Sequence, residues 1–152
     1  MRSLLVLSIL VATACAPEPE PLTPEGVAQV WTGSFQSDDG CYDSELRFEL
    51  VHGGDGWLTG FMTERVPADN VRRSWGLHAD TAVSDLDAVY RVDASLSDGR
   101  LSLDLVDLLE GDESFCLSSA ELWSDGDSGA LTGAWDAPDC GCTGSSELLS
   151  EG

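Results

Sequence analysis

The sequence predicts an all-β protein: an antiparallel meander of about eight strands that forms a small closed or nearly closed β-barrel. Apolar and polar residues alternate along several short segments, as in strands with one face in water. Turn sequences such as HGGDG separate those segments at even spacing. Thr-Gly recurs between large apolar residues in WTGSF, LTGFM and LTGAW. A β-sandwich is the alternative architecture that would bury one face of each strand.

The clearest alternation lies in DSELRFELV, where Leu46, Phe48 and Leu50 share one face and charged residues occupy the other. Because such segments are short and joined by tight turns, neighbouring strands should pair antiparallel. The window AVSDLDAVY is the best helical candidate, and it is ambiguous between helix and strand. The candidate strands are 28–36, 43–51, 56–65, 74–80, 87–96, 100–107, 116–124, 129–136 and 143–149.

The repeated Thr-Gly pairs need an explanation, because glycine weakens the interior of a strand. Gly33 lies on the same face as Trp31, and Gly133 lies on the same face as Trp135. Such glycines indicate a bend, a bulge or a large ring packed over bare backbone, and strongly coiled sheets use them to turn corners. Their presence in the first strand and in a late strand predicts that the two ends of the sheet meet.

LTGAW weakly resembles the first-strand motif of the avidins, and close Trp–Gly spacing is similar to that of the avidin and lipocalin group of meander barrels. In this chain LTGAW falls near the C-terminus, WTGSF has the reverse order, and the T-D-Y signature of lipocalins is absent. The resemblance implies a meander barrel and transfers no ligand-binding residue.

The N-terminal stretch MRSLLVLSILVATAC has a positive start, a short apolar run and small residues before a cysteine. It predicts an export signal over residues 1–14. Together with Cys15 it resembles the lipobox of bacterial lipoproteins, although Ala12 stands where that family most often has Leu. The resemblance implies cleavage before Cys15 and lipid modification of its thiol. Ordinary secretion, with Cys15 unmodified, is the alternative.

Residues 15–27 should form a tether, because APEPEPLTPEG is rich in Pro and Glu and has little apolar surface to bury. The acidic all-β domain is then expected over residues 28–149. Within the lipoprotein resemblance, Ala16 in place of Asp favours the outer membrane. The expected partner is therefore a membrane, contacted through the lipid anchor.

The charge of the chain excludes one class of partner. With Arg2 removed, six Arg oppose 28 acidic residues and the net charge is −22. A field of this sign repels phosphate backbones and anionic membrane surfaces, so nucleic acid is not expected as a partner.

Four further cysteines, Cys41, Cys116, Cys140 and Cys142, predict two disulfides in an exported chain. Cysteines at i and i+2 rarely bond each other, because the bridge would be strained. Cys140 and Cys142 should therefore each pair with Cys41 or Cys116, in an order that the sequence leaves open. A metal site is the weaker alternative, because C-x-C is the only close pair.

No motif indicates catalysis, and no cofactor or metal is expected. His52 and His78 are the candidates for hydrolytic chemistry, but no G-x-S-x-G motif accompanies them. DGDSG at 125–129 has part of the spacing of a calcium loop and is more typical of a hairpin turn. Arg65, Arg72 and Arg73 form a basic cluster that either balances the surrounding acids or contacts an anionic partner.

The expected function is a binding or structural role for a cell-envelope lipoprotein, whose partner could be another envelope protein. One alternative is a carrier of a small apolar ligand, because five Trp could line a barrel mouth. The other is a hydrolase of envelope polymers, which requires His52 or His78 beside carboxylates. A core filled by its own side chains is expected ahead of a hollow one.

Overall fold

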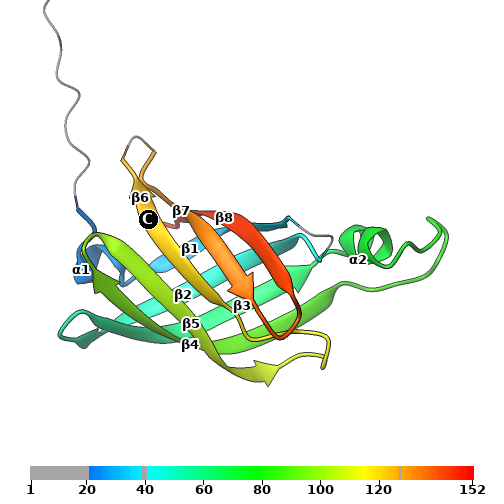
Figure 1. Ribbon diagram of the computed structural model, residues 1–152, viewed down its shortest axis with the longest axis horizontal. Helices are drawn as coiled ribbons and strands as arrows, with labels where there is room; N and C mark the ends of the chain where they lie inside the picture. Colours follow the sequence, from blue (N-terminus) through cyan, green and yellow to red (C-terminus); the bar gives the residue numbers. More distant parts are fainter. Residues whose placement is uncertain (1–20, 39–40, 127) are drawn as a thin grey trace, which may run out of the picture.

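Eight antiparallel strands close into a barrel in the computed structural model of the chain, which describes residues 21–38, 41–126 and 128–152. Each strand pairs with its neighbours in sequence order, and the last strand pairs with the first (Figure 1). The strands are β1 (Val30–Ser37), β2 (Ser44–Gly54), β3 (Trp57–Val66), β4 (Leu86–Ser97), β5 (Arg100–Glu110), β6 (Ser119–Asp125), β7 (Ala130–Ala137) and β8 (Cys142–Ser150).

The pairing of β1 with β8 closes the sheet. Its register runs from Trp31 opposite Ser150 to Ser37 opposite Gly144. On its other side β1 pairs with β2, so the first strand has no free edge. The prediction of an antiparallel meander barrel is therefore confirmed, and the sandwich alternative is wrong.

The alternation in the sequence places the apolar residues inside the barrel. Leu46, Phe48 and Leu50 are at most 5% exposed, whereas Glu45 and Glu49 between and beside them point outward. The largest fully buried side chains come from strands all around the barrel, which makes the core continuous. They are Tyr90, Phe48, Met62, Leu101, Leu103, Leu122, Leu131, Leu148, Val27, Val66, Val71 and Val92.

At the three Thr-Gly glycines the backbone of the neighbouring strand leaves no room for a side chain. A Cβ added to Gly33 would lie 1.9 Å from the carbonyl oxygen of Glu147 on β8. Gly60 and Gly133 would meet the carbonyl oxygens of neighbouring strands at the same distance. No side chain fits such a space, so glycine is what permits the tight coiling of the sheet. The expectation of a strongly coiled sheet is confirmed, whereas the nearest neighbour of each of these glycines is a backbone oxygen and not an aromatic ring.

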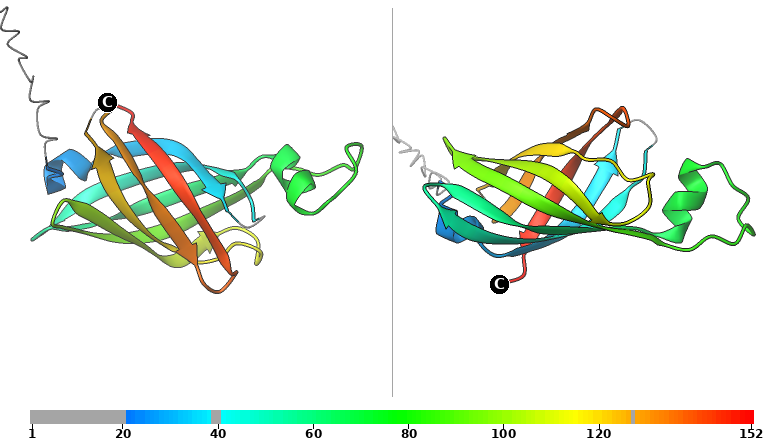
Figure 2. Two further views of the ribbon diagram at one scale, coloured as in Figure 1. Left: turned by 45° about the horizontal axis from the view of Figure 1, so that its top comes forward. Right: turned by 90° about the horizontal axis from the view of Figure 1, so that it is seen from below.

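Helix α1 (Pro24–Val27) covers one end of the barrel (Figure 2). The Thr23 hydroxyl accepts a hydrogen bond from the backbone N–H of Gly26, and Pro24 starts the helix. Val27 is fully buried, and its carbonyl accepts a 3.0 Å hydrogen bond from the indole of Trp31. Val27, the last residue of the predicted tether over 15–27, therefore packs into the core of the barrel.

Helix α2 (Ala68–Ser74) lies in the connection between β3 and β4, beyond the opposite end of the barrel (Figures 1 and 2). The predicted strand at 74–80 is wrong, because this helix takes its first residue and a loop takes the rest. Pro67 precedes the helix, Asp69 lies in its first turn, and two Arg lie in its last turn, which suits the helix dipole. In the structure the window AVSDLDAVY is a loop up to Asp85 and a strand from Leu86 onward.

Neither of these two helices has the length and apolar content needed to cross a bilayer, as far as the described ranges extend.

Candidate functional site

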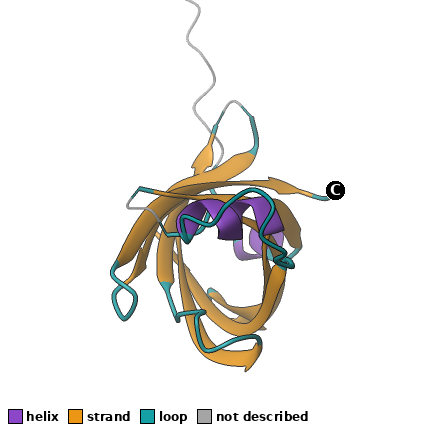
Figure 3. Cartoon of the chain, turned by 90° about the vertical axis from the view of Figure 1, so that its right-hand side faces the viewer, coloured by secondary structure: helices purple, strands orange, loops and turns teal. Residues whose placement is uncertain are grey.

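A cavity of about 290 Å³ opens at the α2 end of the barrel. Viewed from this end, α2 lies over one side of the ring of strands (Figure 3). The volume is close to the lower end of the range for small-molecule sites, roughly 300–1,000 Å³. The β1–β2 loop, the β5–β6 loop, the β7–β8 loop and α2 all contribute to the cavity. Its principal lining side chains are Phe35, Tyr42, Leu46, Met62, Glu64, Trp75, Phe115 and Trp135.

Trp135 is the least exposed of the aromatic residues that line this cavity. Its ring stacks on Phe48, with centroids 5.9 Å apart, and meets the edge of Phe35 at 6.4 Å. Its indole N–H donates a 2.6 Å hydrogen bond to Oγ of Ser146, which is buried on the neighbouring strand. The polar end of the Trp is therefore satisfied, and an apolar ring surface remains for the cavity.

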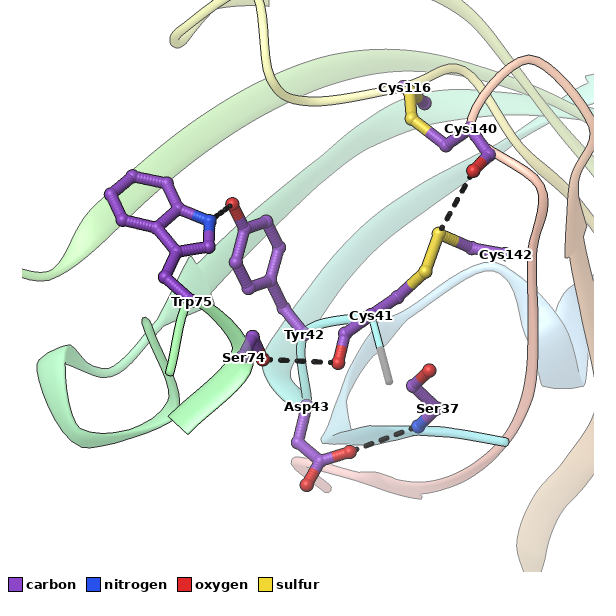
Figure 4. The surroundings of a disulfide bond; sticks show 9 residues. All are labelled: Ser37, Cys41, Tyr42, Asp43, Ser74, Trp75, Cys116, Cys140 and Cys142. Carbon is purple, nitrogen blue, oxygen red and sulfur yellow. Dashed lines mark hydrogen bonds between the residues drawn. A yellow bond between two sulfur atoms is a disulfide. The ribbon is translucent and has the colours of Figure 1, made fainter. Parts of the chain in front are cut away.

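Trp75 and Tyr42 form the outer rim. The indole N–H of Trp75 donates to the hydroxyl of Tyr42 at 2.8 Å, and the two ring centroids are 6.3 Å apart (Figure 4). Two further hydrogen bonds join α2 to the β1–β2 loop: Ser74 Oγ donates to the carbonyl of Cys41, and Asn70 Nδ2 donates to that of Asp43. Trp75 is 53% exposed, so it stands at the entrance of the cavity.

Two disulfides hold the loops around the cavity. Cys41 bonds to Cys142, and Cys116 bonds to Cys140; in both pairs the Cα atoms are 6.1 Å apart (Figure 4). The prediction of two disulfides with Cys140 and Cys142 in separate bridges is confirmed. The first bridge ties the β1–β2 loop to the start of β8, and the second ties the β5–β6 loop to the β7–β8 loop. All four cysteines of these bridges line the cavity, so its rim is cross-linked.

Glu64 is the one acidic or basic side chain among the described residues that line the cavity. It belongs to the inward face of β3, between Met62 and Val66. The hydroxyl of Tyr90 on β4 donates a 3.1 Å hydrogen bond to its Oε2. The side chain keeps some accessible surface because it faces the cavity. The protein around it nevertheless removes most of its water, and this burial raises the pKa of Glu64.

Two hydroxyls partly offset that burial. The Tyr90 hydrogen bond and the nearby Ser44 hydroxyl both favour the charged carboxylate and lower the pKa of Glu64, by less than burial raises it. Ser44 Oγ is buried without a well-aligned hydrogen bond, so the contribution of Tyr90 is the better defined one. Burial and the adjacent negative charge in turn raise the pKa of the Tyr90 phenol.

Glu64 was not among the candidates from sequence, although a signal for it existed. The alternation in WLTGFMTERV puts Glu64 in phase with Leu58 and Met62, on the buried face. A carboxylate in phase with buried residues is unusual and indicates a site or a paired charge.

The histidine candidates lie away from this cavity. His52 is exposed near the end of β2, towards the α1 end of the barrel, and His78 is exposed in the loop after α2. Neither lines the cavity. Within the described ranges, no group of three or more His, Cys, Asp or Glu side chains is placed to hold a metal ion.

The remaining candidates have local structural roles. The DGDSG stretch joins β6 to β7 as a hairpin turn, in which the Ser128 hydroxyl donates to the Asp125 carboxylate; its central Asp127 lies outside the described residues. Arg65 pairs with Asp85, and Arg72 pairs with Asp69, so the basic cluster is largely neutralised by its neighbours. The proposed lipidation site, Cys15, also lies outside the described residues.

Comparison of the chain with protein-family models, curated proteins and solved structures found no match. The class of this protein is therefore defined by the fold and the cavity of the chain itself. It is an eight-stranded antiparallel meander barrel, closed edge to edge, with a cross-linked aromatic cavity at one end.

Proposed function

We propose that the chain is an exported ligand-binding module, which holds one small and largely apolar molecule in the mouth of its barrel. The observation that carries the proposal is the cavity of about 290 Å³ at the α2 end. Half of its lining residues are aromatic or aliphatic, and the others are the four bridged cysteines, three serines and Glu64. Apolar walls with a small number of polar groups are typical of small-molecule sites.

The construction of the rim supports the same proposal. The Cys41–Cys142 and Cys116–Cys140 bridges and the hydrogen bond from Trp75 to Tyr42 hold the loops in place around the opening. A cavity whose walls are held before the ligand arrives spends less free energy on ordering loops during binding. Side chains fill the middle of the barrel and leave a cavity at its α2 end, so the ligand must be small.

Binding can be tested with three ligands of similar size that differ in charge: 2-phenylethylamine, 2-phenylethanol and phenylacetate. Trp75 and Trp135 line the cavity, so a bound ligand should change the tryptophan fluorescence. Ala137→Trp fills the cavity from the inward face of β7, and Ala134→Trp places the same ring on the outer face. We expect at least one ligand to bind, Ala137→Trp to abolish binding, and Ala134→Trp to leave it unchanged. The absence of binding by all three ligands would overturn the proposal.

We further propose that the module is a lipoprotein anchored through Cys15, at the outer membrane where the host has one. The support is the lipobox-like sequence that ends at Cys15 and the Pro/Glu-rich stretch after it. Multiple acyl chains anchor a protein stably, since each buried CH₂ contributes about 0.8 kcal/mol. Mass analysis of the mature N-terminus should find acyl chains on Cys15, and Cys15→Ser should release the protein from membranes. An unmodified mature chain would contradict the anchor.

A further inference from the structure

We propose that the ligand of this cavity is an organic cation, an amine carried on a small apolar body, and that Glu64 selects it. This inference rests on the proposed ligand-binding function and names the chemical class of the ligand. Four features support it. Glu64 lacks a cationic partner, its burial destabilises the fold, aromatic rings line the cavity, and the domain is strongly acidic.

Glu64 has no cationic partner within the described part of the protein. None of the residues lining the cavity is an Arg or a His. Five arginines instead form ion pairs with other acids on the outside of the domain. Those pairs are Arg47 with Glu49 and Glu151, Arg65 with Asp85, Arg72 with Asp69, Arg91 with Asp107, and Arg100 with Glu121.

A carboxylate in this position costs the fold stability. Burial raises the pKa of Glu64, and among the described residues Tyr90 alone donates a well-defined hydrogen bond to it. A charged group removed from water needs a partner of opposite charge or several hydrogen bonds. An ammonium group in the cavity would supply that partner, and the surrounding low polarity would strengthen the attraction between the two charges.

The walls of the cavity suit the same kind of group. Five aromatic rings line it, and the faces of such rings attract cations. These rings belong to Phe35, Tyr42, Trp75, Phe115 and Trp135. Rings and a carboxylate together favour an ammonium over a neutral alcohol of the same shape, and they disfavour an anion.

The whole domain adds a long-range preference of the same sign. The 28 acidic residues of the chain outnumber its six arginines once Arg2 is removed. An acidic surface raises the local concentration of cations and lowers that of anions. The modest volume of about 290 Å³ then limits the apolar body of the amine to roughly the size of one ring with a short side chain.

The test compares 2-phenylethylamine, 2-phenylethanol and phenylacetate by isothermal titration calorimetry at neutral pH. We expect the amine to bind at least tenfold more tightly than the alcohol, and phenylacetate to bind more weakly than both. Glu64→Gln keeps the shape of the side chain and should remove the preference for the amine. Glu147→Gln, an exposed change on the outer face of β8, should preserve it.

Two results would overturn the inference while the proposed function stands: equal affinity for the alcohol and the amine, or an undiminished preference for the amine in Glu64→Gln. If none of the three ligands binds, the proposed function fails and this inference fails with it. Thermal unfolding of both Gln variants shows whether each is folded, so a loss of binding through unfolding is recognised.

Discussion

The hydroxyl of Tyr90 on β4 donates a 3.1 Å hydrogen bond to Oε2 of Glu64 on β3, a residue that lines the cavity. This contact joins the core of the barrel to its candidate site, because Tyr90 is fully buried and also meets the edge of the Phe115 ring at 6.5 Å. Because the protein largely removes this carboxyl group from water, the stability of the fold should depend on its protonation and so on pH.

The first prediction concerns this sensitivity. Because burial raises the pKa of Glu64 in the folded protein above its unfolded value of 4.5, the folded state binds the proton more tightly. Protonated Glu64 therefore makes its full contribution to folding stability below pH 4.5. This contribution is lost as the pH rises through the pKa that Glu64 has in the folded protein. Glu64→Gln should therefore raise the melting temperature at pH 7 and flatten its dependence on pH in this window.

Melting curves recorded at several pH values test this prediction. Glu147→Gln removes a carboxyl from the outer face of β8 and serves as the control, for which we expect a smaller change. If Glu64→Gln lowered the melting temperature at pH 7, the charged form of Glu64 would be stabilising and the stated direction would be wrong.

Much of the fold could be predicted from sequence because its signals are local. Alternation identifies the inward face of a strand from its own residues, as for Leu46, Phe48 and Leu50. Helix α2 escaped prediction because only one residue of its seven, Val71, is fully buried, so it has no apolar period to detect. Its stability comes from contacts with residues far away in sequence, such as the Asn70 hydrogen bond to Asp43.

The candidate site was harder to predict, because strand register and loop placement create it. The aromatic mouth was an alternative expectation, whereas the role of Glu64 depends on its being opposite Leu46 on β2 and Ala88 on β4. The pairing of the cysteines depends on where the β1–β2 and β5–β6 loops reach, which no spacing within the sequence determines.

The second prediction concerns the Thr-Gly glycines. Gly33→Ala would place a Cβ 1.9 Å from the carbonyl oxygen of Glu147, which belongs to the paired backbone and cannot move aside cheaply. We expect a loss of about 3 kcal/mol or more in the free energy of unfolding, at or above the upper end for overpacked sites. Gly53→Ala is the matched control, because its nearest neighbour would lie at an ordinary 3.5 Å. Urea unfolding of the two variants should separate them clearly, and equal losses would contradict the close approach.

The third prediction orders the two disulfides. Cys41 and Cys142 are 101 residues apart, whereas Cys116 and Cys140 are 24 apart. Constraint of the unfolded chain increases with loop length, so removal should cost about 4.7 kcal/mol for the long loop and about 3 to 4 kcal/mol for the short one. Denaturant unfolding of the paired Cys→Ser variants measures both values. A larger loss from the 24-residue bridge would show that native contacts, and not loop length, dominate.

The last prediction tests whether α1 is part of the domain. The indole N–H of Trp31 donates a 3.0 Å hydrogen bond to the carbonyl of Val27, in a buried position. Trp31→Phe keeps an aromatic ring but removes the indole donor, while the Val27 carbonyl keeps its 2.8 Å hydrogen bond from the backbone N–H of Gln29. The loss of this one hydrogen bond should cost about 0.5–1.5 kcal/mol. Trp57→Phe makes the same change at a side chain that is 60% exposed, where we expect a change within about 0.5 kcal/mol. Similar losses in the two variants would mean that α1 contributes little to the closure of the barrel, whereas a larger loss for Trp31→Phe would identify α1 as the cover of that end.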